Sequence, residues 1–191
     1  PGTFTVCSVG NPIGSNSVDY MVVAGGGGGG SWAGGGAGAG GFRESSGTAS
    51  GSYSASPLGA CVSALPVTVT GFPITVGAGG SGAPSYPNRE NATNGSNSVF
   101  STITSQGGGK GGNDPNPSQP TADGNSGGSG GGGRSGGGAG NTPPVSPPQG
   151  NTGGAGHFCG VNYFGGGGGG AGAVGSSDPG GNDAGPGGAG V

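Results

Sequence analysis

The stretch MVVAGGGGGG at residues 21–30 passes without a break from apolar residues into six consecutive glycines, and a second six-glycine run stands at residues 165–170. A glycine run has no side chains to bury, so any stable structure depends on its backbone. Such runs adopt a polyproline-II-like helix with three residues per turn and no internal hydrogen bonds. Because buried amides must be paired, these helices are stable only when they bond laterally to one another. The two runs therefore predict a bundle of polyglycine-II helices.

The composition of the whole chain has the same character. Its 191 residues include 59 glycines and 16 prolines, and only 27% are hydrophobic. Such a composition commonly indicates disorder, and collagen is excluded because the glycines come in blocks. As the ordered alternative we predict a mostly irregular, all-β fold: a layered polyglycine-II helix bundle with a small β region. We expect essentially no α-helix, since no stretch has helical periodicity.

The pure glycine blocks are expected to lie inside this bundle, where a side chain would separate neighbouring helices and break their lateral bonds. The blocks assigned to interior helices are Gly25–Gly30, Gly107–Gly112, Gly130–Gly133 and Gly165–Gly170. The positions expected to be structural are Gly25, Gly28, Gly30, Gly107, Gly132, Gly167 and Gly170.

Strand signals are concentrated in two parts of the chain. Thr3–Val9 and Ser17–Ala24 are rich in Thr, Val, Phe and Tyr and flank a turn-forming stretch. The clearest strand pattern is LPVTVTGFPITV at residues 65–76, where the parity of the apolar residues changes at Gly71 and predicts a bulge or reversal. Ser98–Thr104 is expected to form a further strand.

This pattern divides the chain into two regions. Residues 1–24 are the expected β lead-in, and residues 25–191 the polyglycine-II domain, with β segments at about 65–104. We expect both to be part of a longer chain.

The charge and the hydropathy exclude several partners. The net charge is −3, with four basic residues that form no cluster, so we expect no nucleic acid to bind. No apolar run approaches the ~20 residues of a membrane span. Cys7, Cys61 and Cys159 permit at most one intrachain disulfide or are simply small buried residues, and without CxxC spacing we expect no metal site.

Catalytic residue types are sparse, and we expect the protein not to be an enzyme and to need no cofactor. His157 is the single histidine, and its pairing with Cys159 is the one conceivable nucleophile dyad. The numerous GxGxxG matches carry no weight, because they follow from the glycine content.

Aromatic residues stand beside or between the glycine blocks, where they either cap the helix ends or form a contact surface. Exposed aromatics on loops held by a rigid scaffold commonly bind sugars or protein loops. The contact candidates are Trp32, Tyr53, Tyr86, His157, Phe158, Tyr163 and Phe164.

Three segments in order carry a resemblance to a known family: VDYMVVAGGGGGGSWAGGGAGAGGFR (18–43), LPVTVTGFPITVGAGGSG (65–82) and NGSNSVFSTITSQGGGKGG (94–112). The chain resembles the glycine-rich domain of bacteriophage tail-fibre and fibre-tip adhesin-like virion proteins. The resemblance implies a virion location and a layered polyglycine scaffold that presents loops to a host cell-surface glycan or protein. It also implies other fibre subunits as partners, in a homo-oligomer.

Two other functions stay open from the residues. A subunit of a cellular extracellular filament or surface layer would need the same scaffold. An ice-binding protein would also use polyglycine helices, but regular Gly-X-X spacing and a flat face would be expected there, not bulky loops.

Overall fold

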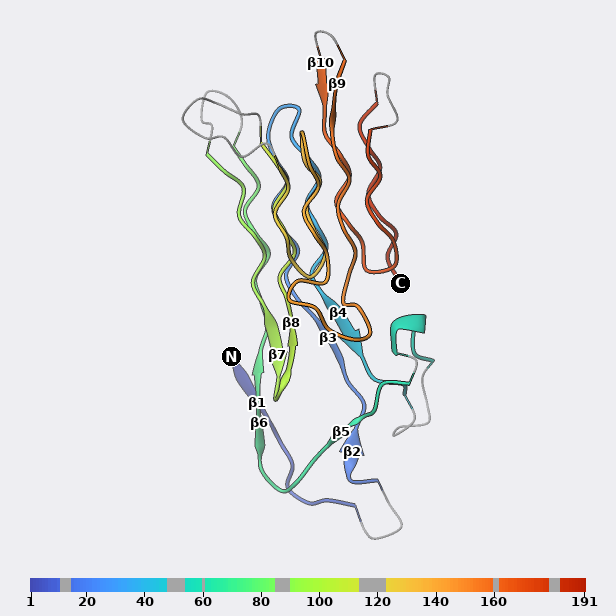
Figure 1. Ribbon diagram of the computed structural model, residues 1–191. Coiled ribbons are helices and arrows are strands. Elements are labelled where there is room, and N and C mark those ends of the chain that lie inside the picture. The colour runs from blue at the N-terminus through green and yellow to red at the C-terminus, as the bar shows by residue number, and fades with distance from the viewer. Residues whose placement is uncertain are drawn as a thin grey trace.

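Figure 1 shows the computed structural model, an elongated molecule with a β region at one end and long extended segments that rise from it. It describes residues 1–10, 15–47, 54–59, 61–84, 90–113, 123–159, 162–178 and 183–191. Within these residues there is no α-helix, and the helical element is a single 3-10 turn, η1 (Pro57–Gly59). The predicted class, mostly irregular and β, is confirmed. We call the end with the β region proximal and the opposite end distal.

The strands are short and antiparallel. They are β1 (Gly2–Thr5), β2 (Ser17–Val18), β3 (Met21–Val23), β4 (Phe42–Glu44), β5 (Leu65–Pro66), β6 (Gly71–Thr75), β7 (Ser98–Phe100), β8 (Ile103–Ser105), β9 (His157–Cys159) and β10 (Asn162–Phe164). One sheet has the order β1-β6-β7-β8, and three two-stranded sheets pair β2 with β5, β3 with β4 and β9 with β10. In the larger sheet Ile74 lies opposite both Gly2 and Phe100, which fixes its register.

The predicted strands are confirmed in place but not in length. The interruption at Gly71 is real: the chain bends at residues 69–70 and β6 begins at Gly71. The single strand expected at Ser98–Thr104 is wrong, because Ser101 has a left-handed φ of 54° and turns the segment into the β7–β8 hairpin. The strand expected at Ser17–Ala24 is likewise two strands, and β4, β9 and β10 were not predicted.

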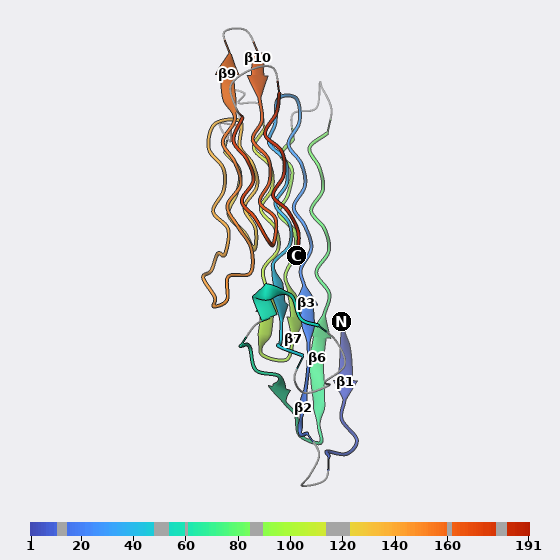
Figure 2. The ribbon, with the colours of Figure 1, turned by 90° about the vertical axis from the view of Figure 1, so that its right-hand side faces the viewer.

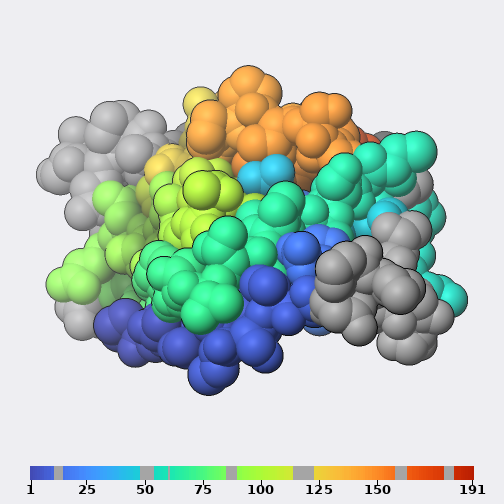
Figure 3. All heavy atoms as spheres, turned by 90° about the horizontal axis from the view of Figure 1, so that it is seen from below, coloured from blue at the N-terminus to red at the C-terminus, as the bar shows by residue number. Residues whose placement is uncertain are grey.

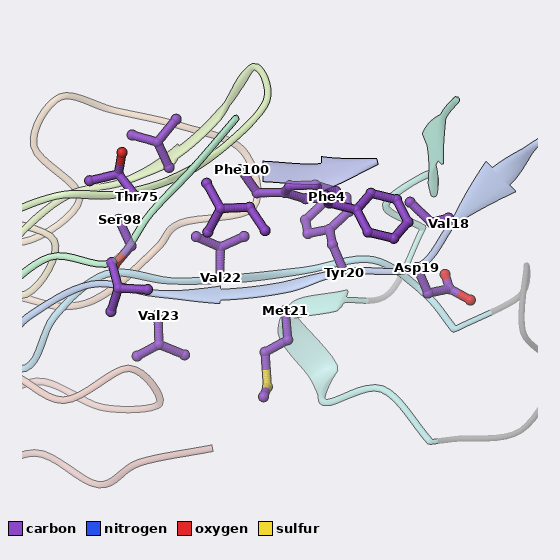
Figure 4. Close-up of a pocket in the computed structure, with 13 residues that line it drawn as sticks. Phe4, Val18, Asp19, Tyr20, Met21, Val22, Val23, Thr75, Ser98 and Phe100 are labelled. Atoms are coloured by element: carbon purple, nitrogen blue, oxygen red, sulfur yellow. The ribbon is translucent and has the colours of Figure 1, made fainter. Parts of the chain in front are cut away.

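The hydrophobic core is small and lies in the proximal β region. Tyr20, Val22 and Ile103 are buried together. Figure 4 shows Val22 directed toward Phe100, while Met21 and Val23 point the other way, as expected of a strand whose side chains alternate. On the sheet, the rings of Phe4, Phe72 and Phe100 pack in mutual contact, with centroids 6.0–6.4 Å apart.

Extended glycine-rich segments continue from these strands toward the distal end; we call them rods. The described rods are residues 24–30, 34–41, 76–84, 91–97, 106–113, 123–128, 129–133, 137–140, 150–156, 165–170, 173–178 and 184–190. Figures 1 and 2 show them side by side in layers, parallel and antiparallel to one another. Strand β3 runs directly into rod 24–30, and β6 into rod 76–84, so strand pairing sets the position at which these rods begin.

Hydrogen bonds between rods repeat every three residues. In rod 106–113, N–H groups three residues apart donate to the same neighbouring rod, and the next such set donates to a different rod. The pairs, donor first, are Gly108 to Gly25, Gly111 to Gly28, Gly109 to Ser129 and Gly112 to Gly132, all at 2.9 Å. Among the described glycines only Gly47 has a positive φ, so the rods share one hand. A three-residue period with negative φ is that of polyproline II and differs from the two-residue period of a β-strand.

A three-residue helix has three N–H directions and three C=O directions, and a central rod uses all six. Rod 129–133 donates to rods 34–41, 123–128 and 150–156. It accepts hydrogen bonds from rods 106–113, 137–140 and 165–170. Backbone hydrogen bonds therefore join this central rod to six neighbouring rods.

Burial follows the number of neighbours. The blocks 107–112, 130–133 and 165–170 are buried throughout, as predicted. Block 25–30 lies nearer the edge, with four neighbouring rods, so Gly28 is buried whereas Gly25 and Gly30 are half-buried. The remaining predicted structural glycines, Gly107, Gly132, Gly167 and Gly170, are all buried.

Two asparagines complete the surroundings of rod 106–113, which has neighbouring rods on five sides. The third set of N–H groups, from Gly107 and Lys110, donates to the side-chain Oδ1 atoms of Asn97 and Asn94, each at 2.9 Å. The two asparagines stand three residues apart on rod 91–97, one turn of a polyproline-II helix. Their amide oxygens take the place of a sixth rod.

A buried glutamine fixes the junction between the rods and the β region. The Gln149 side chain has no exposed surface; its Oε1 accepts from the Gln106 N–H at 2.8 Å, and its Nε2 donates to the Pro143 carbonyl. The main-chain carbonyl of Gln149 accepts a hydrogen bond from the N–H of Phe42, the first residue of β4. Figure 3 shows this part of the chain (orange) against the proximal end of the molecule.

Glycine substitutions test the interior placement of the rods. A Cβ at Gly28 would overlap the Ser81 carbonyl, and one at Gly167 the Pro186 carbonyl, whereas one at Gly29 meets no atom within 4 Å. We expect Gly28→Val and Gly167→Val to lower the free energy of unfolding by at least about 3 kcal/mol, since each unpaired buried amide costs about 1–3 kcal/mol. Gly29→Val, the neighbouring control, should change it little in chemical denaturation. Equal stability of all three variants would contradict this packing.

The asparagine pair gives a second prediction. Asn97→Ala removes the acceptor for the buried Gly107 N–H, so we expect a loss of about 1–2 kcal/mol in the free energy of unfolding. Asn97→Asp keeps an oxygen in the same place and should retain most of the stability. Denaturant titration of the two variants makes the comparison, and equal losses would show that the acceptor oxygen is not what matters.

Candidate contact surface at the distal end

The first predicted contact residue, Trp32, stands at the tip of a tight turn. Residues 31–33 connect rods 24–30 and 34–41, and the Gly30 N–H donates to the Gly35 carbonyl at 3.0 Å below the turn. Trp32 has a φ of 58°, and its side chain is 71% exposed. A left-handed tryptophan costs free energy that the flanking rods must offset. The rods therefore hold a large aromatic surface outward at the distal end.

A buried asparagine anchors this turn. The Asn113 side chain, only 3% exposed, accepts a hydrogen bond from the Ser31 N–H at 3.3 Å. Its amide group donates to the Asn91 Oδ1 and the Glu90 carbonyl. Asn113 thus joins three segments and fixes where Trp32 emerges.

An arginine–tyrosine pair lies at the same end. Residues 134–136 connect rods 129–133 and 137–140, and the Gly136 N–H donates to the Asp123 carboxylate at 2.6 Å. The Arg134 guanidinium lies over the Tyr163 ring, 3.3 Å from its centroid. Such a cation–π contact contributes about 0.5–2 kcal/mol. Since Arg134 is mostly buried while Tyr163 is 41% exposed, the arginine supports the ring from beneath.

The predicted loop His157–Phe164 is a β-hairpin. Strands β9 and β10 pair with Tyr163 opposite Phe158 and Phe164 opposite His157, and the hairpin projects at the distal end in Figure 1. His157 is exposed and Phe164 half-buried, while the side chain of Phe158 is outside what the structure describes. The pairing of these two strands was not predicted from the sequence.

Two more contact candidates, Tyr53 and Tyr86, lie outside the described residues. The structure therefore brings Trp32, His157, Tyr163 and Phe164 to one end of the bundle, on turns and a hairpin held by rods.

Sequence reasoning missed Arg134 and Asn113. The signal for Arg134 was available: Arg134-Ser135 interrupts a glycine run in the same way as Ser31-Trp32-Ala33 does, and each interruption marks a rod end. Asn113 contacts Ser31 across 82 residues of sequence. A hydrogen bond between residues so far apart in the sequence cannot be predicted from a local sequence pattern.

Ionisable groups offer little further chemistry in the described part of the chain. No group of three or more His, Cys, Asp or Glu side chains suitable for a metal ion occurs there. Burial lowers the pKa of the Lys110 ammonium. Cys7 and Cys61 are free and exposed, so the interpretation of the cysteines as buried apolar residues is wrong for these two. No described helix is long and apolar enough to cross a membrane.

No curated protein and no solved structure is detectably similar to the chain. A family model described as a glycine-rich domain matches residues 1–191. The chain therefore belongs to this glycine-rich domain family.

Proposed function

We propose that the chain is a structural and adhesive component of a virion, a phage tail-fibre or fibre-tip domain that presents its distal end to a host surface. The observation that supports this most is Trp32, held 71% exposed at a turn whose two arms are hydrogen-bonded rods. A rigid scaffold lowers the entropy lost when such a side chain binds a partner. Location in a virion or elsewhere outside the cell is part of the same proposal.

The chemistry of the distal residues suits a cell-surface glycan or a protein loop. The Trp32 and Tyr163 rings offer flat faces, the Tyr163 hydroxyl and the exposed His157 offer hydrogen bonds, and Arg134 fixes the tyrosine. Binding energy at interfaces is usually concentrated in a few Trp, Tyr and Arg residues. The glycine faces of the rods offer only backbone groups, so we assign recognition to the distal end.

A second candidate is a subunit of a cellular extracellular filament or surface layer. The observation in its favour is an open groove beside rod 165–170, between rods 34–41 and 184–190, because side-by-side assembly of copies needs a surface of this kind. Both functions use the same fold, and they differ in what the distal aromatics contact.

Truncation of the distal aromatics distinguishes these functions. We expect Trp32→Ala and Tyr163→Ala to weaken attachment at least tenfold, since they remove the aromatic faces from the contact surface. Labelled protein would be measured against panels of bacterial cells and immobilised surface glycans. Val69→Ala is the matched control, a similarly exposed apolar residue in the proximal region.

Thermal melts of the same variants separate a loss of attachment from a loss of folding. Trp32→Ala should melt as the parent does, while Tyr163→Ala should lose about 0.5–2 kcal/mol with the Arg134 contact. Attachment unchanged in both variants would contradict the adhesive function, and reduced self-association of Trp32→Ala would favour the filament.

A further inference from the structure

Rod 165–170 has one open position among its six. Among the described residues it bonds to rods 34–41, 129–133, 150–156, 173–178 and 184–190. Between rods 34–41 and 184–190 there is instead a groove of about 450 Å³. Its lining is glycine and alanine, with larger side chains only near one end; the residues are Val23, Ala37–Gly40, Phe42, Gly168–Ala171, Gly187, Gly188, Gly190 and Val191.

Unpaired backbone groups face this groove. Gly166 and Gly169 donate to rod 129–133, and Gly167 and Gly170 donate to rod 173–178. Since three residues complete a turn, the remaining N–H groups, those of Gly165 and Gly168, are directed at the open position. Neither N–H finds an acceptor in the described part of the chain.

The opposite wall supplies acceptors with the same spacing. The carbonyls of Ala37 and Gly40, one turn apart on rod 34–41, receive no hydrogen bond from any described residue. A rod in the groove would accept from Gly168 and donate to these carbonyls. The groove thus has the hydrogen-bonding period of a missing polyglycine-II helix.

Rod 106–113 differs from rod 165–170 at the corresponding position. Rod 106–113 also has five neighbouring rods, but Asn94 and Asn97 cap its sixth direction. No side chain of the described residues caps Gly168 in this way.

We propose that the groove binds rod 76–84 of a second copy of this chain. Among the described rods this one bonds only to rods 24–30 and 91–97, and it lies on the opposite edge of the bundle (green in Figure 1). Its sequence, VGAGGSGAP, has mostly glycine and other small residues after Val76, so it can pack closely against the glycine and alanine lining of the groove. The N–H and C=O groups of Gly79 and Gly82, one turn apart, have no partner among the described residues.

Apolar residues set the relative direction of the two copies. Val76, 80% exposed, begins rod 76–84 at its proximal end. Val23 and Val191, both about half exposed, line the groove, and Val23 ends β3 at the proximal end. Copies that point the same way therefore bring Val76 onto these valines. The contact joins two different surfaces, so it produces either a closed ring or an open row of aligned molecules.

Two substitutions block the two sides separately. A Cβ at Gly187 in the groove, or at Gly79 on the rod, comes no closer than 3.8 Å to another atom, so both valine variants should fold. We expect Gly187→Val and Gly79→Val each to raise the dissociation constant for self-association at least tenfold in sedimentation velocity. Ala139→Val is the control, an exposed position on rod 137–140, which borders neither surface. Should Gly187→Val melt early, Gly190→Val replaces it, since its Cβ meets nothing within 4 Å.

Mixing the two variants gives the sharper test. Gly187→Val keeps an intact rod 76–84 and Gly79→Val keeps an intact groove, so an equimolar mixture should form dimers and stop there. A parent protein that stays monomeric at high concentration would overturn the proposal, as would a mixture that does not dimerise. Loss of association in Gly187→Val alone would overturn rod 76–84 as the occupant. These experiments measure only self-association, so their outcome does not depend on whether the protein attaches to a host.

Discussion

The lateral hydrogen bond between three-residue glycine helices is the constraint on which the rest of the molecule depends. Ordering glycine carries a larger entropy loss than ordering any other residue, and here almost no apolar side chain contributes within the rods. The amides of one rod are paired by its neighbours, as when Gly109 and Gly112 donate to Ser129 and Gly132. No rod is stable alone, because an isolated polyproline-II helix leaves every amide to water. The bundle is therefore cooperative across its width, and a Cβ inside it acts on several rods at once.

Side chains in this fold serve mainly at the ends and edges of the rods. At the proximal end, the strands of the β region and the buried Gln149 fix where the rods begin, and a small core around Tyr20 and Val22 stabilises that starting arrangement. At the distal end Asn113 and Arg134 hold the turns. This division explains how exposed aromatics are tolerated on a scaffold of little apolar content: backbone pairing beneath them sets their positions.

The sequence was sufficient to predict the type of helix, three of the four blocks assigned to the interior and the approximate β region, because each of these is a local property of composition. The neighbours of each rod were not predictable, since one glycine run is chemically the same as the next and the pairing is decided over long distances. The roles of Asn94 and Asn97 could be recognised only after rod 106–113 was seen to lack a sixth neighbour. Trp32 and Tyr163 were identified as contact candidates from their place beside glycine blocks, whereas the pairing of His157 with Phe164 in a hairpin depended on two strands of three residues each.

A finite bundle of such helices has the same difficulty as a β-sheet with exposed edges, but in two dimensions. Each outer rod leaves at least one set of N–H or C=O groups directed outward, repeated every turn, and the next rod of any copy presents the complementary set. Water, asparagine side chains three residues apart or another rod can each form hydrogen bonds with these groups. The residues at the edge determine which of the three does so. An edge with asparagines three residues apart ends the array. An edge lined by alanine and glycine, such as that beside Gly168, permits it to continue. In this fold, the difference between a monomer and an assembly therefore rests on a few side chains outside the glycine blocks.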